Sequence, residues 1–261
     1  MRDIILHYHI FKNAGSTVDS ILRRNFPQMA GSIEGEFAWG TLKSSDIVDY
    51  ALANKNLCAI SSHQARLPLP HHAGVQFHPL LFIRHPIDRL RSIYDFDRRQ
   101  VDCSSNLPAR MAKNNNLTGY LKWRLQHNKG AVVRNFQTIH IAAREFDTRT
   151  ACANHQDLYT AKQRLLTLPC YGIVERFDES MKIITNYLNP IFGKLDTTHI
   201  IENHSNLRKL TLTERLHDVE SELGNKFYAE VLNLNALDLE LYRYANELFS
   251  RLSLQLSSTK P

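Results

Sequence analysis

Three short apolar segments in the first third of the chain have the length and composition of buried strands. They cover residues 4–10, 57–60 and 80–83, and each is followed by polar residues. After the first segment the chain turns at Lys12 to Gly15, and apolar residues then recur at helical spacing. After the third, a helical pattern continues to about residue 99. The pattern predicts strand-turn-helix units in which each strand delivers polar side chains at its carboxyl end.

The remainder of the chain is richer in helical periodicity. Residues 171–174 resemble another short strand that leads into a helix over 178–188, and a helix is expected over 117–125. Apolar residues at three- and four-residue intervals over 214–223 and 226–252 predict a helical C-terminal third. The fold class expected is therefore α/β, with a central, mostly parallel sheet flanked by helices in three layers.

Composition supports one globular unit. The chain has 261 residues, 43% of them hydrophobic, which suffices for a sizeable core. We expect a single domain over residues 1–255 and a flexible tail over 256–261. The 32 Lys and Arg against 26 Asp and Glu suit an anionic ligand but lack the dense basic runs of nucleic-acid-binding tails.

The cysteines and the N-terminus constrain the cellular setting. The four cysteines form no CxxC pair, so neither a zinc site nor a disulfide framework is indicated. The first apolar segment is too short to span a membrane and lacks the features of a signal peptide. We expect a cytoplasmic protein without stable membrane insertion, a nucleic-acid partner or a bound metal.

The segment FKNAGST, residues 11–17, has the form of an anion-binding loop. Ligands of open parallel sheets bind outside the carboxyl ends of the strands, and a helix N-terminus presents free N–H groups to an anion. The segment is not a Walker A loop, because Lys12 precedes its one glycine. An ordinary strand-to-helix turn with an exposed lysine is the alternative.

A second phosphate contact is available where the third strand ends. An Arg84 guanidinium and the Ser92 hydroxyl, eight residues further on, can bond one phosphate. The alternatives are a surface ion pair of Arg84 with Asp88 or Asp95, and Ser92 as a small packing residue. Neither residue alone would be persuasive.

The two motifs together resemble a known family. HYHIFKNAGST (7–17) is similar to the 5′-phosphosulfate loop of carbohydrate-type sulfotransferases that use 3′-phosphoadenosine-5′-phosphosulfate (PAPS), including the heparan and uronyl sulfotransferases. FIRHPIDRLRSIY (82–94) resembles their 3′-phosphate segment, with its R-x-P-x-x-R-x-x-S-x-Y pattern. YGIVERFDES (171–180) and NALDLELY (235–242) resemble later blocks of the same family, so the likeness spans nearly the whole chain.

The resemblance implies a P-loop-like fold, PAPS as sulfuryl donor, 3′-phosphoadenosine-5′-phosphate (PAP) as product, and a hydroxyl-bearing acceptor such as a carbohydrate. Lys12 would contact the bridging oxygen of the leaving group, where negative charge grows during in-line transfer. The donor-binding residues implied are Lys12, Asn13, Ala14, Gly15, Ser16, Thr17, Arg84 and Ser92. The loop departs from the commoner form of the family at Phe11 and Ala14, and we expect Ala14 to require a right-handed backbone.

Transfer to a hydroxyl also needs a general base, and His63 is the candidate. It follows the second strand, at a position where many relatives carry a catalytic histidine, and histidine titrates near neutrality. A loop histidine at a strand end is the alternative. His7 and His9 alternate with apolar residues on the first strand, which favours a supporting role in the core, and His71 and His72 lack the flanking ligands of a metal site.

Two further segments admit both a functional and a structural interpretation. Residues 134–138, RNFQT, resemble the N-x-Q-T segment of heparan and uronyl sulfotransferases, although polar residues before a helix also serve as caps. Tyr120, Lys122, Trp123 and Arg124 are candidates for an acceptor groove, but their helical spacing suits packing equally well.

Two other functions remain open at this point. A P-loop-like kinase for a nucleotide or small molecule would use a similar anion cradle, but the sequence shows no Walker A order and no evident metal carboxylate. A non-catalytic anion-binding module would keep the fold without transfer. The acceptor, its regiochemistry and the oligomeric state are not specified by the sequence.

Overall fold

A computed structural model describes residues 1–37, 40–101, 103, 106–126, 130–143, 152–198 and 211–258. Its strands are β1 (Arg2–Tyr8), β2 (Ala30–Ser32), β3 (Ala59–Ser62), β4 (Val75–Leu80), β5 (Phe82–Ile83) and β6 (Gly172–Ile173). The helices of the first half are α1 (Gly15–Asn25), α2 (Ser44–Ala53), α3 (Pro86–Arg99), α4 (Leu107–Asn114) and α5 (Leu117–Leu125). Those of the second half are α6 (Phe136–Ala142), α7 (His155–Thr167), α8 (Phe177–Phe192), α9 (Leu212–Leu223), α10 (Asn225–Leu234) and α11 (Ala236–Ser258). Single 3₁₀ turns cover Ala131–Val133 and Val174–Arg176.

The strands form a parallel sheet in the order β2-β3-β1-β4, and a second parallel pair joins β5 to β6. The pair continues the main sheet, because only Leu81 separates β4 from β5 and its carbonyl accepts the N–H of Gly172 at 2.9 Å. Parallel strands need crossover connections, and these are largely helical here. All carboxyl ends therefore lie at one edge of the sheet, as the sequence predicts.

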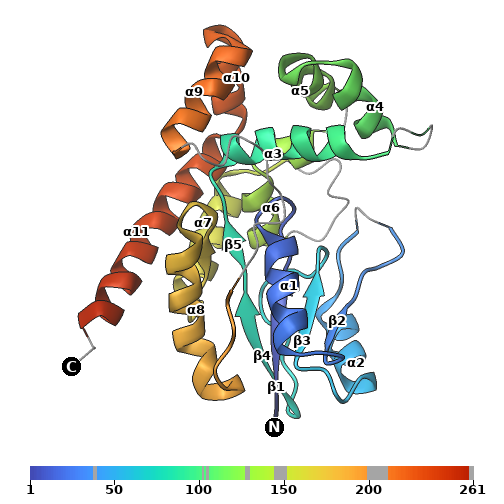
Figure 1. Cartoon of the computed structure of the whole chain (residues 1–261), viewed down its shortest axis with the longest axis vertical. Coiled ribbons are helices and arrows are strands. Elements are labelled where there is room, and N and C mark those ends of the chain that lie inside the picture. The colour runs from blue at the N-terminus through green and yellow to red at the C-terminus, as the bar shows by residue number, and fades with distance from the viewer. Residues whose placement is uncertain are drawn as a thin grey trace.

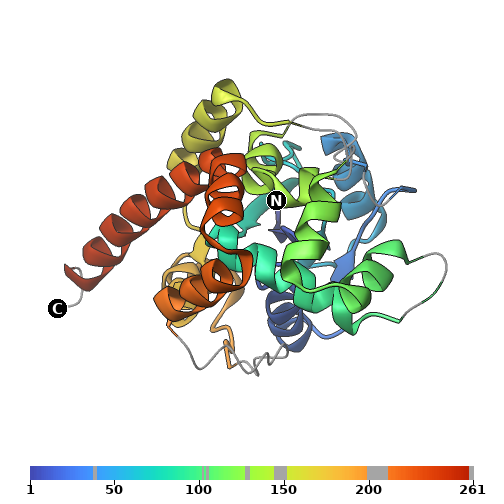
Figure 2. The ribbon, with the colours of Figure 1, turned by 90° about the horizontal axis from the view of Figure 1, so that it is seen from above.

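Helices cover both faces of the sheet in three layers. In Figure 1, α1 and α8 lie in front of the strands, whereas α2, α6 and α7 lie behind them, and the view from above in Figure 2 agrees. Helices α3, α4, α5, α9 and α10 lie beyond the carboxyl ends of the strands, and α11 runs diagonally down one side. The predicted α/β class, with its flanked parallel sheet and helical C-terminal third, is confirmed.

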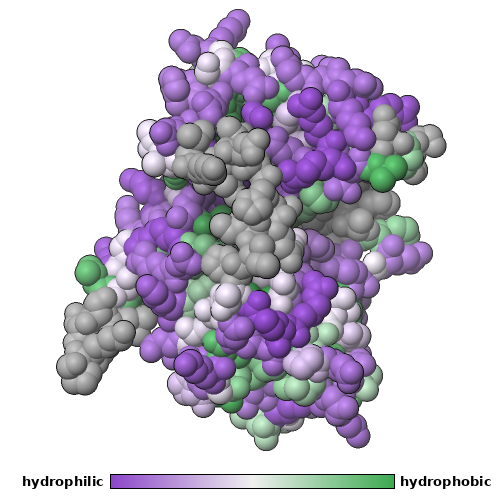
Figure 3. Space-filling view, in the orientation of Figure 1, coloured by the Kyte–Doolittle hydropathy of each residue, from purple (hydrophilic) through white to green (hydrophobic). Residues whose placement is uncertain are grey.

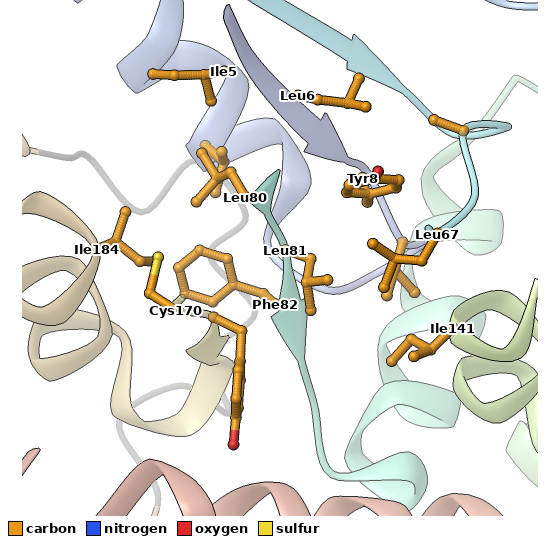
Figure 4. Packing of buried hydrophobic residues seen from close by; sticks show 14 of the residues in the cluster. Ile5, Leu6, Tyr8, Leu67, Leu80, Leu81, Phe82, Ile141, Cys170 and Ile184 are labelled. Carbon is orange, nitrogen blue, oxygen red and sulfur yellow. The ribbon is translucent and has the colours of Figure 1, made fainter. Parts of the chain in front are cut away.

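The main core lies between the sheet and its flanking helices. Figure 4 shows Ile5, Leu80, Phe82 and Ile184 packed together from β1, β4, β5 and α8, and all four are at most 2% exposed. A second, smaller cluster of buried side chains joins α3, α5, α9 and α10 above the sheet edge. Burial of a large aliphatic side chain contributes about 1.5–3 kcal/mol, so these two clusters account for much of the stability.

The strand boundaries differ from the sequence prediction at the start of β4 and at both ends of β1. The apolar run at 80–83 is the end of a longer segment that begins at Val75 and bends at Leu81. Gln76, His78 and Pro79 interrupt the apolar pattern of β4, which concealed it. The predicted strand over 4–10 starts at Arg2 and ends at Tyr8, because the chain turns toward the FKNAGST loop immediately afterwards.

The helical pattern over 226–252 corresponds to two helices, because the chain breaks between α10 and α11. Asn235, at the break, is 1% exposed, and its amide donates to the carbonyls of Val133 and Val231 at 3.0 and 3.1 Å. The side chain thus ties the break to the chain before α6. Helix α11 continues to Ser258, three residues beyond the expected end of the domain, and residues 259–261 of the expected tail lie outside the described residues.

The face of the molecule in Figure 3 is largely hydrophilic, with small scattered apolar areas. Among the described residues, no helix combines the length and the apolar character needed to cross a membrane.

Helices α6 and α11 cap one another through buried polar side chains. The Asp238 carboxylate accepts the N–H groups of Gln137 and Thr138 at 3.1 and 2.7 Å and the Thr138 hydroxyl at 2.8 Å. In return, the Asn135 side chain accepts the N–H of Asp238 at 3.0 Å. Each carboxylate or amide oxygen satisfies N–H groups at a helix start that would otherwise be buried without partners.

Removing this carboxylate should destabilise the whole fold. Asp238→Ala leaves three donors unpaired in a fully buried position, and we expect the free energy of unfolding to fall by about 3–5 kcal/mol. Urea unfolding followed by circular dichroism measures this change. The matched change Asp218→Ala, on the exposed face of α9, should alter stability by at most about 0.5 kcal/mol. Equal effects of the two substitutions would contradict the capping role.

Candidate anion site at the sheet edge

A pocket of about 120 Å³ opens at the carboxyl end of β1, between the FKNAGST loop and α3. The residues that line it are His9, Phe11, Lys12, Ala14, Gly15, Ser16, Thr17, His63, Arg84, Ser92 and Phe96. The structure therefore brings together both predicted phosphate contacts and the predicted base, which come from three separate strand ends.

The loop backbone is strained in a way that the sequence did not predict. Ala14 has φ 63° and ψ 15°, a left-handed conformation, so the expected right-handed backbone at this residue is wrong. Lys12 is also left-handed, with φ 65°. Non-glycine residues adopt this region at a cost of about 1–2 kcal/mol, and such residues concentrate at functional sites. The loop turns sharply enough here to aim the start of α1 at the pocket.

The N-terminus of α1 is prepared for an anion. Val18 makes the first intrahelical bond, to the Ala14 carbonyl at 3.1 Å, so the N–H groups of Gly15, Ser16 and Thr17 belong to the unpaired first turn. No acidic residue and no side-chain cap occupies that turn. The helix dipole adds partial positive charge at the same place.

Asn13 differs from the other predicted loop residues, because its side chain points inward. It is 2% exposed, and its amide donates to the Phe82 carbonyl and to Gln137 Oε1, both at 2.7 Å. The same Gln137 oxygen accepts the N–H of Arg84 at 2.9 Å, and the Gln137 amide donates to the Arg84 carbonyl at 2.8 Å. Gln137, from the N-x-Q-T segment, thus fixes both the loop and the end of β5.

Arg84 forms the ion pair with Asp88 that was considered as an alternative, but not at the surface. Its Nε and Nη2 atoms both lie 2.8 Å from Asp88 Oδ2, while Nη1 donates to the Lys12 carbonyl at 2.9 Å. Asp88 also binds Arg215 of α9 at 2.7 Å. Burial acts to raise the pKa of Asp88, but the two guanidiniums outweigh it and lower that pKa. Asp88 thus joins the guanidinium of Arg84, which lines the pocket, to that of Arg215 on α9.

A second arginine, Arg89, also fixes the position of the loop. Arg89 is fully buried, donates from Nε to the Phe11 carbonyl at 3.0 Å, and binds the Val132 carbonyl through both terminal nitrogens. Its guanidinium lies 4.5 Å from the centre of the Phe136 ring. The second arginine of the R-x-P-x-x-R pattern therefore positions the loop instead of facing the pocket.

Lys12 of the loop and Ser92 of α3 both line the pocket. The Lys12 ammonium lies 4.4 Å from the centre of the Phe96 ring, which in turn packs edge-on against Phe11 at 5.5 Å. Ser92 projects from α3, one turn before Phe96. The aromatic face of Phe96 attracts the ammonium and holds it beside the pocket.

His63 is oriented as a base requires. Its Nδ1 lies 2.9 Å from the carbonyl of His9, an acceptor, so Nδ1 carries the proton and Nε2 keeps its lone pair. Its backbone N–H donates to Glu34 at 2.7 Å. Burial, followed by the neighbouring His9, lowers the pKa of His63, so the neutral imidazole predominates near pH 7.

The structure also assigns packing roles to residues of α5 for which the sequence left an acceptor groove open. Tyr120 and Arg124 form a buried network with Asp97, in which Arg124 lies 2.7 Å from the carboxylate, and Lys122 packs over Phe227. These side chains stabilise the helices above the sheet and do not line the pocket with the loop. The sequence underrated His9, Phe96 and Gln137, because a single chain shows spacing but not which side chains meet.

The left-handed backbone at Ala14 gives a direct test of the loop geometry. Ala14→Gly removes the clash between Cβ and the backbone, and we expect the free energy of unfolding to rise by about 1 kcal/mol. Ala51→Gly, inside α2, should instead lower it by about 1 kcal/mol or more. Chemical denaturation of both variants measures the difference. A loss of stability in Ala14→Gly would show that the loop adopts another conformation.

Comparison with known proteins agrees with this geometry. The chain is 31% identical over 254 residues to an uncharacterised protein of the archaeon Archaeoglobus fulgidus, covering 95% of this chain and 98% of the relative. Residues 2–245 match the sulfotransferase family, a span that includes the anion loop, Arg84, Ser92 and His63. The chain therefore belongs to the sulfotransferase family.

Proposed function

We propose that the protein transfers a sulfuryl group from PAPS to an acceptor hydroxyl. The observation that carries the proposal is the gathering of Lys12, Arg84, Ser92 and His63 around one pocket at the N-terminus of α1. Family membership supports sulfotransfer as the reaction class. The order of donor motifs along the chain supports PAPS as the donor, with its 5′-phosphosulfate on the loop and its 3′-phosphate at Arg84 and Ser92.

The transfer is an in-line displacement at sulfur. The acceptor oxygen forms the new bond to sulfur as the bond from sulfur to the bridging oxygen breaks, and PAP leaves with the electron pair. Lys12, next to the anion cradle, neutralises the charge that grows on that bridging oxygen. The first-turn N–H groups of α1 stabilise the phosphosulfate oxygens throughout, because they are fixed before the donor arrives.

The acceptor hydroxyl gives its proton to Nε2 of His63. A base must be neutral to accept a proton, and the lowered pKa of His63 keeps it so in the free protein. The hydrogen bond from Nδ1 to the His9 carbonyl fixes the ring and stabilises the imidazolium that forms. The ring of His63 packs against His9, but the residue keeps an exposed surface from which an acceptor can approach.

For the acceptor we propose a carbohydrate or glycoconjugate hydroxyl. This assignment rests on the likeness of both donor motifs to carbohydrate-type enzymes, since acceptor contacts come from variable loops. A panel of glycans, lipids, peptides and small alcohols with labelled PAPS distinguishes the possibilities.

The donor assignment predicts which side chains matter for PAP binding and turnover. Lys12→Ala should lower kcat by about 10²–10³, because a preorganised charge at the leaving group is lost. Ser92→Ala should weaken PAP binding by about tenfold, the value of one hydrogen bond to a charged group. Calorimetry gives the affinities, and transfer of label from PAPS gives kcat.

The control for these variants is Arg99→Ala, at the exposed end of α3, which removes a positive charge away from the pocket and should change neither quantity. The proposal fails if the wild-type protein does not bind PAP. Magnesium-dependent ATP binding with phosphate transfer would instead support a kinase.

The assignment of the base predicts a separation of binding from turnover. His63→Asn should lower kcat by about 10²–10⁴ while PAP affinity changes little. In the wild type, the rate should rise with pH through the pKa of His63, and because that pKa is lowered, the acid limb should lie below about pH 6.5. The exposed His71→Asn serves as control. If His63→Asn leaves kcat and the acid limb of the pH–rate profile unchanged, another residue is the base. Biological activity without sulfuryl transfer would instead indicate a binding module.

A further inference from the structure

The ring of His9 lies directly against the start of α1, a contact that the sequence did not predict. It follows β1, lines the pocket and is 12% exposed as a side chain. A Cβ atom on Gly15 would lie 2.0 Å from His9 Nε2, so the ring rests directly on the Gly15 Cα. Gly15 is therefore required for close approach. The Nε2 edge of His9 lies at the first turn of α1, where the phosphosulfate group is expected.

The opposite edge of the ring is held by a carboxylate. His9 Nδ1 lies 3.1 Å from Asp19 Oδ2, and Asp19 Oδ1 lies 2.8 Å from His7 Nδ1. Burial acts to raise the pKa of Asp19, but the hydrogen bonds from the two histidines outweigh it and lower that pKa, so Asp19 is a carboxylate. His9 consequently carries its proton on Nδ1, and in the described part of the chain Nε2 has no protein partner.

The charged and titratable groups that face His9 come from every side of it. His7 lies on β1, Lys12 on the loop, Asp19 on α1 and His63 after β3, with the ring centres of His9 and His63 only 3.8 Å apart. Without a donor, burial lowers the pKa of His9, and Lys12 and His7 act in the same direction against Asp19. The pocket therefore holds a neutral imidazole beside the N-terminus of α1.

We propose that His9 is a donor-binding residue that takes up one proton as PAPS binds, and that its Nε2–H then donates to an oxygen of the phosphosulfate group. This inference rests on the proposed function. The incoming anion supplies the charge that favours the imidazolium, and Asp19 accepts from its other nitrogen, so both N–H groups are satisfied.

The proton on His9 does not move during transfer. The acceptor proton goes to His63, the sulfur–oxygen bond to PAP breaks, and His9 releases its proton only when PAP leaves. A charged His9 beside His63 also disfavours a second charge, which keeps His63 neutral and ready as the base until the acceptor reacts. The neighbouring rings of His9 and His63 thus divide two proton roles between donor and acceptor.

Proton uptake can be measured directly on the wild-type protein. PAPS without acceptor is titrated by calorimetry at pH 7.5 in buffers of different ionisation enthalpy. At this pH the phosphosulfate is ionised, and the 3′-phosphate, whose second pKa is about 6, is almost fully ionised as well. We expect uptake that approaches one proton per PAPS and an affinity that falls as pH rises from 6.5 to 8.5. In histidine NMR spectra, the pKa of His9 should rise on addition of PAPS.

Three variants separate this role from general damage to the site. His9→Asn should abolish the proton uptake, weaken PAPS about 10–100-fold at pH 6.5, and remove the pH dependence. Asp19→Asn should shift the pH dependence to lower pH, because the imidazolium loses its partner carboxylate. His63→Asn should retain the uptake, although it removes the proposed base.

The outcomes distinguish this inference from the proposed function. If Lys12→Ala weakens PAPS binding but His9→Asn leaves uptake and pH dependence unchanged, His9 is not the proton-binding residue and the inference is wrong while the function stands. If the wild type binds PAPS without proton uptake and the NMR signal of His9 does not shift, the inference is likewise overturned. If the wild type binds no PAPS, both fail.

Discussion

The buried amide of Gln137 is the contact on which the geometry of the site depends. One oxygen accepts from the Asn13 side chain and from the Arg84 backbone, and its nitrogen donates to the Arg84 carbonyl. These bonds join the anion loop after β1 to the end of β5, two chain segments that share no regular backbone pairing. A buried amide that lost either partner would leave polar atoms unsatisfied, so the arrangement tolerates little adjustment.

From this contact the constraint extends in two directions. Asp238 fixes the start of α6, and so the position of Gln137, from the distant helix α11. On the pocket side, Arg84 donates to the Lys12 carbonyl and Arg89 to that of Phe11, which holds the loop in its left-handed conformation. The strain at Lys12 and Ala14 is thus maintained by tertiary contacts. The result is an anion cradle that is formed before any ligand arrives.

Much of this site could be predicted from the sequence, because the residues proposed to contact phosphate follow strand ends and the carboxyl ends of parallel strands share one edge. The fold class, the loop, Arg84, Ser92 and His63 could be placed by that rule and by family resemblance. The left-handed Ala14 could not, since glycine usually marks such positions and alanine conceals them. The break at Asn235 and the inward Asn13 were equally hidden, because both depend on partners about a hundred residues away along the chain.

The histidines also show that contacts between distant residues could not be predicted from the sequence. Alternation along β1 indicated a supporting role in the core for His7 and His9. His7 is buried, but the fold brings His9 to the pocket, against Gly15, Asp19 and His63. Residue type and spacing thus indicated an anionic ligand as an expectation, whereas the proton roles proposed for His9 and His63 could be inferred only from three-dimensional contacts.

A crystal structure with bound PAP tests the central claim most directly. The account predicts the 5′-phosphate within hydrogen-bonding distance of Lys12 and of the first-turn N–H groups of α1, with the 3′-phosphate between Arg84 and Ser92. PAP bound away from this pocket, or in the reverse orientation with its 3′-phosphate on the loop, would contradict it.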